Sequence, residues 1–156
     1  SSKPVLVTHS NARALNDHVR CKTDEALKAM AKSGGAIGIT GMRNFVKATD
    51  PTTIEDVLDH FDYVAKLVGV EHVGVGSDID LYGYDALPKE ELAKLRSSRD
   101  NEKYKSRERS DIDLLNHPKR MFGLTEGLIG RGYSDQDIYG ILGGHFKRAL
   151  SEIWVE

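Results

Sequence analysis

The sequence is poor in cysteine, in excess charge of one sign and in long apolar runs. Its single cysteine, Cys21, excludes an intrachain disulfide framework and a thiolate zinc cluster. Twenty-two Lys and Arg balance twenty-four Asp and Glu in 156 residues, which disfavours a nucleic-acid binder driven by attraction to phosphate. No apolar run approaches the roughly 20 residues of a membrane-spanning helix. We therefore expect a soluble globular protein of one domain, residues 1–156.

The apolar segments predict an α/β fold with a parallel sheet. Three short runs rich in β-branched residues lack the alternation of a half-exposed strand, so they are typical of strands covered on both faces. These are Pro4–Thr8, Ala36–Thr40 and His72–Gly76. Between them, Asp24–Lys32 and a longer segment ending at Val68 have helical periodicity, and Thr52 with Glu55 predicts a capping box for the second helix. The order β-α-β-α-β implies parallel strands with right-handed crossovers.

The size of this sheet leaves two architectures open. Three parallel strands expose both sheet edges, whereas a closed (β/α)₈ barrel needs roughly 250 residues. The chain is therefore a small open α/β domain or part of a barrel. A charged segment over 81–117 interrupts the pattern; we interpret its core, Lys89–Arg109, as a solvated helix or a loop, with a basic contact surface as the alternative. Helical patterns resume from Met121 onward, where Leu124, Leu128 and Ile129 form one apolar stripe, and Ser134 with Asp137 is a second predicted N-cap.

Two polar residues follow predicted strands and are candidates for chemistry. His9 follows the first strand and Asp78 follows the third, and the carboxyl ends of parallel strands are where α/β proteins place ligands. Imidazole and carboxylate are common ligands of hydrolytic metals, which activate water. Arg20 lies in the loop beyond His9 and is suited to bind a carboxylate. The alternative interpretation is structural: His9 and Asp78 cap neighbouring segments, and Arg20 is a surface residue.

Several segments together resemble the membrane (renal) dipeptidase family of the amidohydrolase superfamily. The similarity covers most of the chain outside 81–117 and rests on ordered motifs rather than on one signature. The matching segments are 3–15, 17–20, 23–25, 34–38, 59–64, 68–80, 124–128, 131–134 and 141–144.

The resemblance implies a fold and an activity. It implies the C-terminal part of a (β/α)₈ TIM-type barrel, with strands six to eight and the closing helices, and hydrolysis of dipeptides by water activated at a two-zinc site. By position, His9 is similar to the last histidine ligand. Asp78 is similar to the aspartate after strand eight, a metal-linked residue that contacts the substrate's amino end and moves the proton. Arg20 is similar to the arginine that binds the substrate carboxylate.

The remaining ligands of such a site have no counterpart in this sequence. The family's His-x-Asp pair, bridging glutamate and earlier histidine precede the segment that matches Ser1, and two side chains do not hold two zinc ions. We therefore expect a complementary N-terminal half, in the same longer chain or in a second chain, and a homodimer is possible. The alternative is a non-catalytic α/β binding or interaction module. Phe45, His145 and the segment 81–83 depart from the family pattern, which leaves the preferred dipeptide or related amide open; the sequence does not indicate a compartment.

Overall fold

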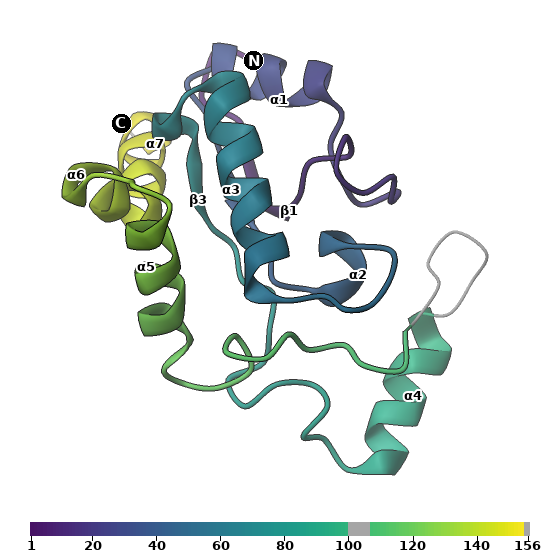
Figure 1. Cartoon of the computed structure of the whole chain (residues 1–156). Coiled ribbons are helices and arrows are strands. Elements are labelled where there is room, and N and C mark those ends of the chain that lie inside the picture. Colours follow the sequence, from purple (N-terminus) through teal and green to yellow (C-terminus); the bar gives the residue numbers. More distant parts are fainter. Residues whose placement is uncertain (100–106, 155–156) are drawn as a thin grey trace.

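The computed structural model describes residues 1–99 and 107–154 and contains a three-stranded parallel sheet (Figure 1). Its strands are β1 (Leu6–Ser10), β2 (Ala36–Ile39) and β3 (Val73–Val75), in the order β1-β2-β3. The predicted parallel β-α-β-α-β order is confirmed. The first strand lies two residues further along than predicted, because a register shift between Val7 and Ser10 lets pairing with β2 continue to Ser10.

Two helices cover one face of this sheet. Helix α1 (Asp24–Lys32) has the predicted bounds and begins at Thr23, whose hydroxyl accepts from the Ala26 amide. Helix α3 (Ile54–Val68) packs against both α1 and the sheet. The shared core is formed by apolar side chains of the two helices and the strands, among them Leu27, Ile37, Phe61, Val64 and Val73, none more than 1% exposed. Burial of this apolar area is the main force that holds the layers together.

The predicted capping box of α3 is wrong by one residue. Thr53 is the N-cap, and its amide and hydroxyl both donate to the carboxylate of Asp56. Thr52 is buried instead, and its hydroxyl donates to the Thr49 carbonyl. Glu55 pairs with Arg131, so it has another partner. The second predicted cap is confirmed, because Ser134 and Asp137 form a reciprocal capping box.

The C-terminal helices cover the remaining side of β3 and the amino ends of the strands. They are α5 (Arg120–Gly130), α6 (Asp135–Tyr139), a π-turn η2 (Gly140–Gly144) and α7 (His145–Ile153). Arg148 of α7 donates to the carbonyls of Gly34 and Glu71, which precede β2 and β3. The predicted stripe on α5 is correct for Leu124 and Leu128, which are buried, and wrong for Ile129, which is 58% exposed.

The charged excursion lies at the opposite end of the sheet. In Figure 1 the N-terminus lies beside α1, at the end of the sheet where α7 also lies, whereas α4 (Lys89–Arg99) lies beyond the carboxyl ends of the strands, at the end where the short helix α2 (Arg43–Val46) is found. A one-turn 3-10 helix (Val70–His72) leads into β3. Within 1–99 and 107–154, no helix is both long and apolar enough to cross a membrane.

Candidate functional site

Buried polar side chains join the loops that leave the carboxyl ends of the strands. The Asn11 side chain donates to the Thr40 carbonyl (3.2 Å) and accepts from the Thr40 amide (3.1 Å), and both residues are fully buried. The Thr40 hydroxyl donates to the Ser77 carbonyl at 2.9 Å, and the Gly41 amide donates to the same oxygen at 3.2 Å. The ends of β1, β2 and β3 are therefore linked into one platform.

His9 lies within β1 rather than after it, which corrects the predicted position. The extension of β1 to Ser10 places the His9 ring at the carboxyl end of the strand. Its Nε2 lies 3.0 Å from Nη2 of Arg20, and its Nδ1 lies 2.9 Å from Oγ1 of Thr8. Because a guanidinium only donates hydrogen bonds, we assign the proton to Nδ1 and the acceptor lone pair to Nε2. That tautomer suits an imidazole that coordinates through Nε2.

Arg20 reaches His9 from an exposed loop that is itself fixed by the platform. The Arg20 carbonyl accepts from the Ser10 hydroxyl at 2.7 Å, and its amide donates to Nδ1 of His18. The Arg20 guanidinium carbon lies 5.4 Å from the ring centre of Phe45, within cation–π range. The structure therefore brings together Arg20 and His9, two of the three predicted site residues.

Asp78 is exposed, in the loop after β3, with a left-handed backbone (φ 55°). Within residues 1–99 and 107–154, no hydrogen bond or ion pair joins its carboxylate to His9 or Arg20. It lies three residues beyond the end of β3, which stops at Val75. Asp78 thus lies at the predicted carboxyl edge of the sheet, but it is separated from the end of β3 by two loop residues instead of following the strand directly.

Two further groups near Arg20 have shifted pKa values. Burial lowers the pKa of His18, and the positive charges of Arg20 and Arg13 lower it further. Burial raises the pKa of the Cys21 thiol to about 11. The thiol is 1% exposed and donates to the Phe45 carbonyl. Cys21 is therefore a packing residue, since a nucleophilic or ligating cysteine requires an accessible thiolate.

The described part of the chain does not by itself provide a metal centre. Among residues 1–99 and 107–154, no three His, Cys, Asp or Glu side chains are grouped so that they could hold a metal ion. His9 has one imidazole lone pair, which here accepts from Arg20, and Asp78 has an exposed carboxylate. This donor set fits part of a divalent metal site and does not fit a complete one, which takes about four ligands.

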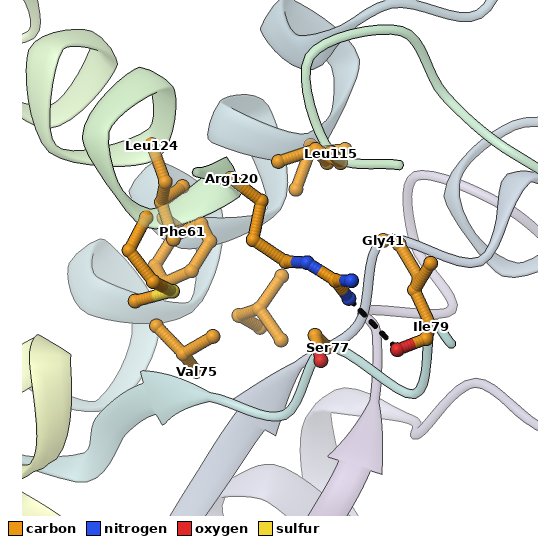
Figure 2. Close-up of a pocket in the computed structure, with 11 residues that line it drawn as sticks. Gly41, Phe61, Val75, Ser77, Ile79, Leu115, Arg120 and Leu124 are labelled. Carbon is orange, nitrogen blue, oxygen red and sulfur yellow. Dashed lines mark hydrogen bonds between the residues drawn. The ribbon is translucent and has the colours of Figure 1, made fainter. Parts of the chain in front are cut away.

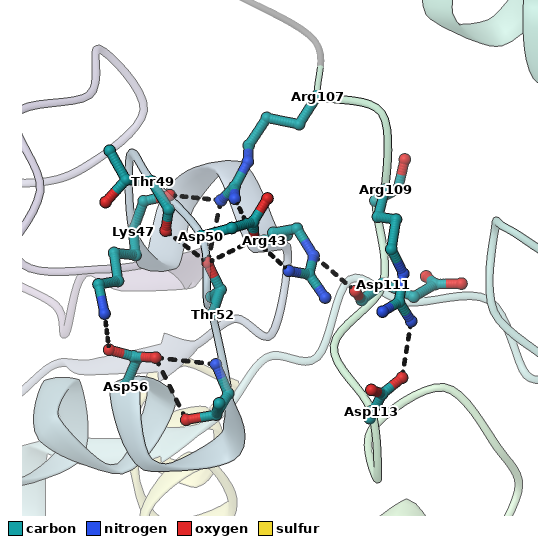
Figure 3. A network of polar contacts seen from close by, with 12 residues as sticks. Arg43, Lys47, Thr49, Asp50, Thr52, Asp56, Arg107, Arg109, Asp111 and Asp113 are labelled. Carbon is teal, nitrogen blue, oxygen red and sulfur yellow. Dashed lines mark hydrogen bonds and ion pairs between the residues drawn. The ribbon is translucent and has the colours of Figure 1, made fainter.

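The charged excursion is attached beside this edge by Arg43, which is buried, and Arg107, which is partly buried (Figure 3). Arg43, 4% exposed, donates from Nε to the Asp111 carbonyl at 2.7 Å and from Nη1 to Asp50 at 2.6 Å. Arg107 pairs with Asp50 and also donates to the hydroxyl of Thr52 at 3.0 Å. The Arg107 and Arg43 guanidiniums hold the pKa of Asp50 below its ordinary value.

Two aspartates close the base of the excursion. Asp111, 1% exposed, accepts from the amides of Tyr84 and Asp85, and the carboxylate of Asp85 accepts from the amides of Ser110 and Asp111. The excursion is thus a helix on a hydrogen-bonded base. The predicted solvated helix is correct for Lys89–Arg99, whereas the base is buried; residues 100–106 of the predicted charged stretch lie outside the described residues.

Sequence reasoning did not identify the residues that organise this edge. Asn11, Thr40 and Arg43 each follow an apolar strand directly or within a few residues, and that position was the available signal. Their roles depend on hydrogen bonds to carbonyls that come together only in the folded chain.

Comparison with known proteins identifies relatives of this fold and sequence. Residues 1–97 match the family model of membrane dipeptidases, peptidase family M19. A dipeptidase from Aspergillus oryzae, aclJ, is 30% identical over 152 residues, which is 96% of this chain and 30% of that protein. An amidohydrolase from Pseudomonas aeruginosa superposes on all of this chain with a TM-score of 0.81 and 27% identity, over 47% of its own length.

A third protein shares the fold. It is a metallo peptidase from Rhodobacter sphaeroides, whose structure holds a phosphinate mimic of the dipeptide L-Ala-D-Ala. It superposes on 99% of this chain with a TM-score of 0.76 and 22% identity, over 37% of its own length. The chain thus spans about a third of the curated relative aclJ and less than half of each of these two structures.

Proposed function

Because the chain belongs to the membrane dipeptidase family, peptidase family M19, we propose that it forms part of a metal-dependent hydrolase that cleaves the peptide bond of dipeptides. The substrate class follows from the family and from the dipeptidase that matches 96% of this chain. Zinc is the proposed metal, with two ions in the complete site.

The proposed architecture is the C-terminal part of a (β/α)₈ barrel. Three features support it: the strands are parallel and sequential, α1 and α3 pack side by side on one face, and both sheet edges belong to strands with a single partner. The backbones are also crowded as in a small barrel. A Cβ on Gly76 would lie 2.1 Å from the Thr8 carbonyl oxygen, and one on Gly38 would lie 2.4 Å from it. The remaining strands would come from the complementary half.

The observation that carries the functional proposal is the contact between His9 and Arg20 at the carboxyl edge of the sheet (3.0 Å). The Nε2 lone pair of His9 accepts a hydrogen bond from the permanently charged guanidinium of Arg20, which lies eleven residues away in sequence. This pairing supports the proposal that a metal ligand, His9, lies beside a carboxylate-binding group, Arg20. A dipeptide, in which about 3–4 Å separates the scissile carbonyl carbon from the carboxylate carbon, needs such closely spaced groups.

Each candidate residue has a distinct proposed role. Arg20 binds the C-terminal carboxylate of the substrate through its two-pronged guanidinium. Asp78 is the proposed catalytic residue: its free carboxylate binds the substrate's amino group and accepts and returns the proton of the attacking water. His9, and Asp78 through the same carboxylate, are proposed to help hold the metal, which supplies Lewis-acid polarisation of the scissile carbonyl when bound.

The small number of metal-ligating side chains in this chain determines what a complementary half must supply. His9 and Asp78 cannot complete two metal sites, so a complementary half, in a longer chain or in a second chain, is proposed to bring the other ligands. In the described residues, no three metal-ligating side chains are grouped together. This observation also fits one alternative, a non-catalytic binding module that keeps the same α/β fold.

The test replaces Arg20 and compares substrates with and without a terminal carboxylate. It uses the chain together with its complementary half, a zinc salt, and a dipeptide or the same dipeptide with an amidated C-terminus. Charge-assisted hydrogen bonds to a carboxylate contribute about 1.5–3 kcal/mol, so Arg20→Gln is expected to lower kcat/KM for the free dipeptide by about 10- to 150-fold. The amidated dipeptide should lose little.

Arg13→Gln is the matched control, because Arg13 lies in the same segment and donates to the Val19 carbonyl rather than to His9. It should leave the ratio between the two substrates unchanged. An equal loss on both substrates in Arg20→Gln would show that Arg20 does not bind the carboxylate. Absence of hydrolysis in the assembled protein with every divalent metal would favour the binding module.

A further inference from the structure

Arg120, at the first position of α5, is a buried arginine whose hydrogen-bond partners are all backbone carbonyls. It is 8% exposed. Its Nη1 donates to the Ile79 carbonyl at 2.7 Å, its Nη2 to the carbonyls of Asp80 and Leu81, and its Nε to the His117 carbonyl at 3.1 Å. Figure 2 shows the side chain crossing a mostly apolar pocket between α3, α5 and the sheet, with its guanidinium directed at Ile79. Arg120 thus joins α5 to the loop after β3.

The buried position of the Arg120 guanidinium is energetically unfavourable unless the loop after β3 compensates for its charge. In the described part of the chain, Arg120 takes part in no ion pair, and burying an unpaired charge is costly. The amino end of a helix also carries partial positive charge, which disfavours a cation there. The three successive carbonyls of 79–81 supply the compensating negative dipoles. The loop and the arginine therefore stabilise each other.

Asp78 lies between two anchors of this loop. On its amino side, the Ser77 carbonyl accepts from the Thr40 hydroxyl and the Gly41 amide. On its carboxyl side, the Ile79 carbonyl accepts from Arg120. Asp78 itself has a left-handed backbone (φ 55°), a conformation that non-glycine residues adopt at a cost and keep only where neighbouring contacts enforce it.

We propose that Arg120 is a positioning residue for the hydrolase, which holds the loop after β3 so that the Asp78 carboxylate is presented at the carboxyl edge of the sheet. This inference rests on the proposed function, in which Asp78 acts on the substrate. Arg120 touches no substrate; it acts through the carbonyls of residues 79–81, which directly follow Asp78.

The test compares Arg120→Lys and Arg120→Met with Arg148→Lys and Arg148→Met. Arg148 is the matched control, because it also donates to two backbone carbonyls, at the opposite edge of the sheet. In the chain assembled with its complementary half, kcat for a dipeptide should fall at least tenfold in Arg120→Met and by less in Arg120→Lys, whose ammonium retains part of the donor set. Both Arg148 variants should keep kcat within about twofold. An unchanged kcat in folded Arg120→Met would overturn the inference.

A double variant separates positioning from general destabilisation. If Arg120 acts through Asp78, Arg120→Met in an Asp78→Asn background should lower kcat no further, because both changes remove the same contribution. An additional tenfold loss in the double variant would show that Arg120 acts independently of Asp78.

An NMR measurement on this chain tests the inference without any activity. The ³J(HN–Hα) coupling and backbone shifts of Asp78 report its left-handed conformation, and they should change in Arg120→Lys while staying unchanged in Arg148→Lys. If the wild-type assembly hydrolyses no dipeptide, the proposed function fails, and the NMR comparison still decides whether Arg120 fixes the loop. Identical Asp78 signals in wild type and in Arg120→Lys would show that Arg120 does not fix the loop.

Discussion

His60 should make the stability of this chain sensitive to mild acid. It lies on α3, is 1% exposed, and bridges two segments near the candidate site. Its Nδ1 accepts from the Ala12 amide at 3.2 Å, and its Nε2 lies 2.8 Å from the Val46 carbonyl. Both contacts are satisfied only by the neutral ring with its proton on Nε2, because a protonated ring would direct a second N–H at the Ala12 amide.

The direction and size of the effect follow from linkage. Burial lowers the pKa of His60 below its ordinary value in the folded chain. The unfolded chain, with a histidine pKa of about 6.5, then binds the proton more readily, so stability is complete above pH 6.5 and is lost as the pH falls below it. The loss of stability between pH 7.5 and pH 5.5 is at most about 1.4 kcal/mol, the value for a ring that stays neutral in the folded state. That is a large part of the stability of a small domain.

Urea unfolding followed by far-UV circular dichroism at pH 7.5, 6.5 and 5.5 measures this loss. Trp154 is 74% exposed and is a weak fluorescence probe for the core. His60→Gln keeps a donor for the Val46 carbonyl but leaves the Ala12 amide unpaired, so it should cost about 1–3 kcal/mol at pH 7.5 and show a flatter pH dependence. Because the pKa of His18 is also lowered, His18→Gln is the control and should retain most of the slope. A His60→Gln protein with the full wild-type slope would refute the assignment.

Two other substitutions or treatments have definite expected outcomes. Gly76→Ala should destabilise the chain by about 1–3 kcal/mol, because the added Cβ would meet the Thr8 carbonyl oxygen. Gly130→Ala is the control: its Cβ would have nothing within 4 Å, so it should be neutral or stabilise by up to about 1 kcal/mol. Equal thermal unfolding midpoints for the two variants would show that the backbone is not crowded at Gly76. Cys21, whose pKa is raised to about 11, should react with a thiol reagent at pH 8 only as fast as the chain opens, and rapid labelling of folded protein would show that the thiol is accessible.

The sequence predicted the sheet because its strands are marked by local composition. Continuous β-branched runs, helical periodicity and glycine after α3 each determine structure over a few residues, so strand order and the bounds of α1 were correct. The limits of β1 and the cap of α3 were not, because they depend on tertiary contacts. Pairing with β2 extends β1 to Ser10, and burial of Thr52 against the excursion moves the cap to Thr53.

Sequence reasoning selected the residues of the candidate site but not the contacts between them. The strand-end rule selected His9 and Asp78, the family resemblance selected these two and Arg20, and the structure places His9 and Arg20 in contact. The linking roles of Asn11 and Thr40 were missed. Amide and hydroxyl side chains are common after strands, and the residues that these two bind lie about 29 and 37 positions away in sequence. The roles of His9, Arg20 and Asp78 in hydrolysis stay predictions until the Arg20 and Arg120 variants are measured.

The distribution of contacts explains how the loops that carry the candidate site residues are kept in order. At the amino edge, α7 covers the strand ends, and Arg148 binds the carbonyls before β2 and β3. At the carboxyl edge, Asn11, Thr40 and Arg120 hold the loops through backbone carbonyls, so the side chains of His9 and Asp78 need no structural partner from each other. The ordering of these loops is therefore separate from metal binding. Variants at His9 should consequently lose metal affinity with little change in the unfolding midpoint, whereas variants at Thr40 should lower both.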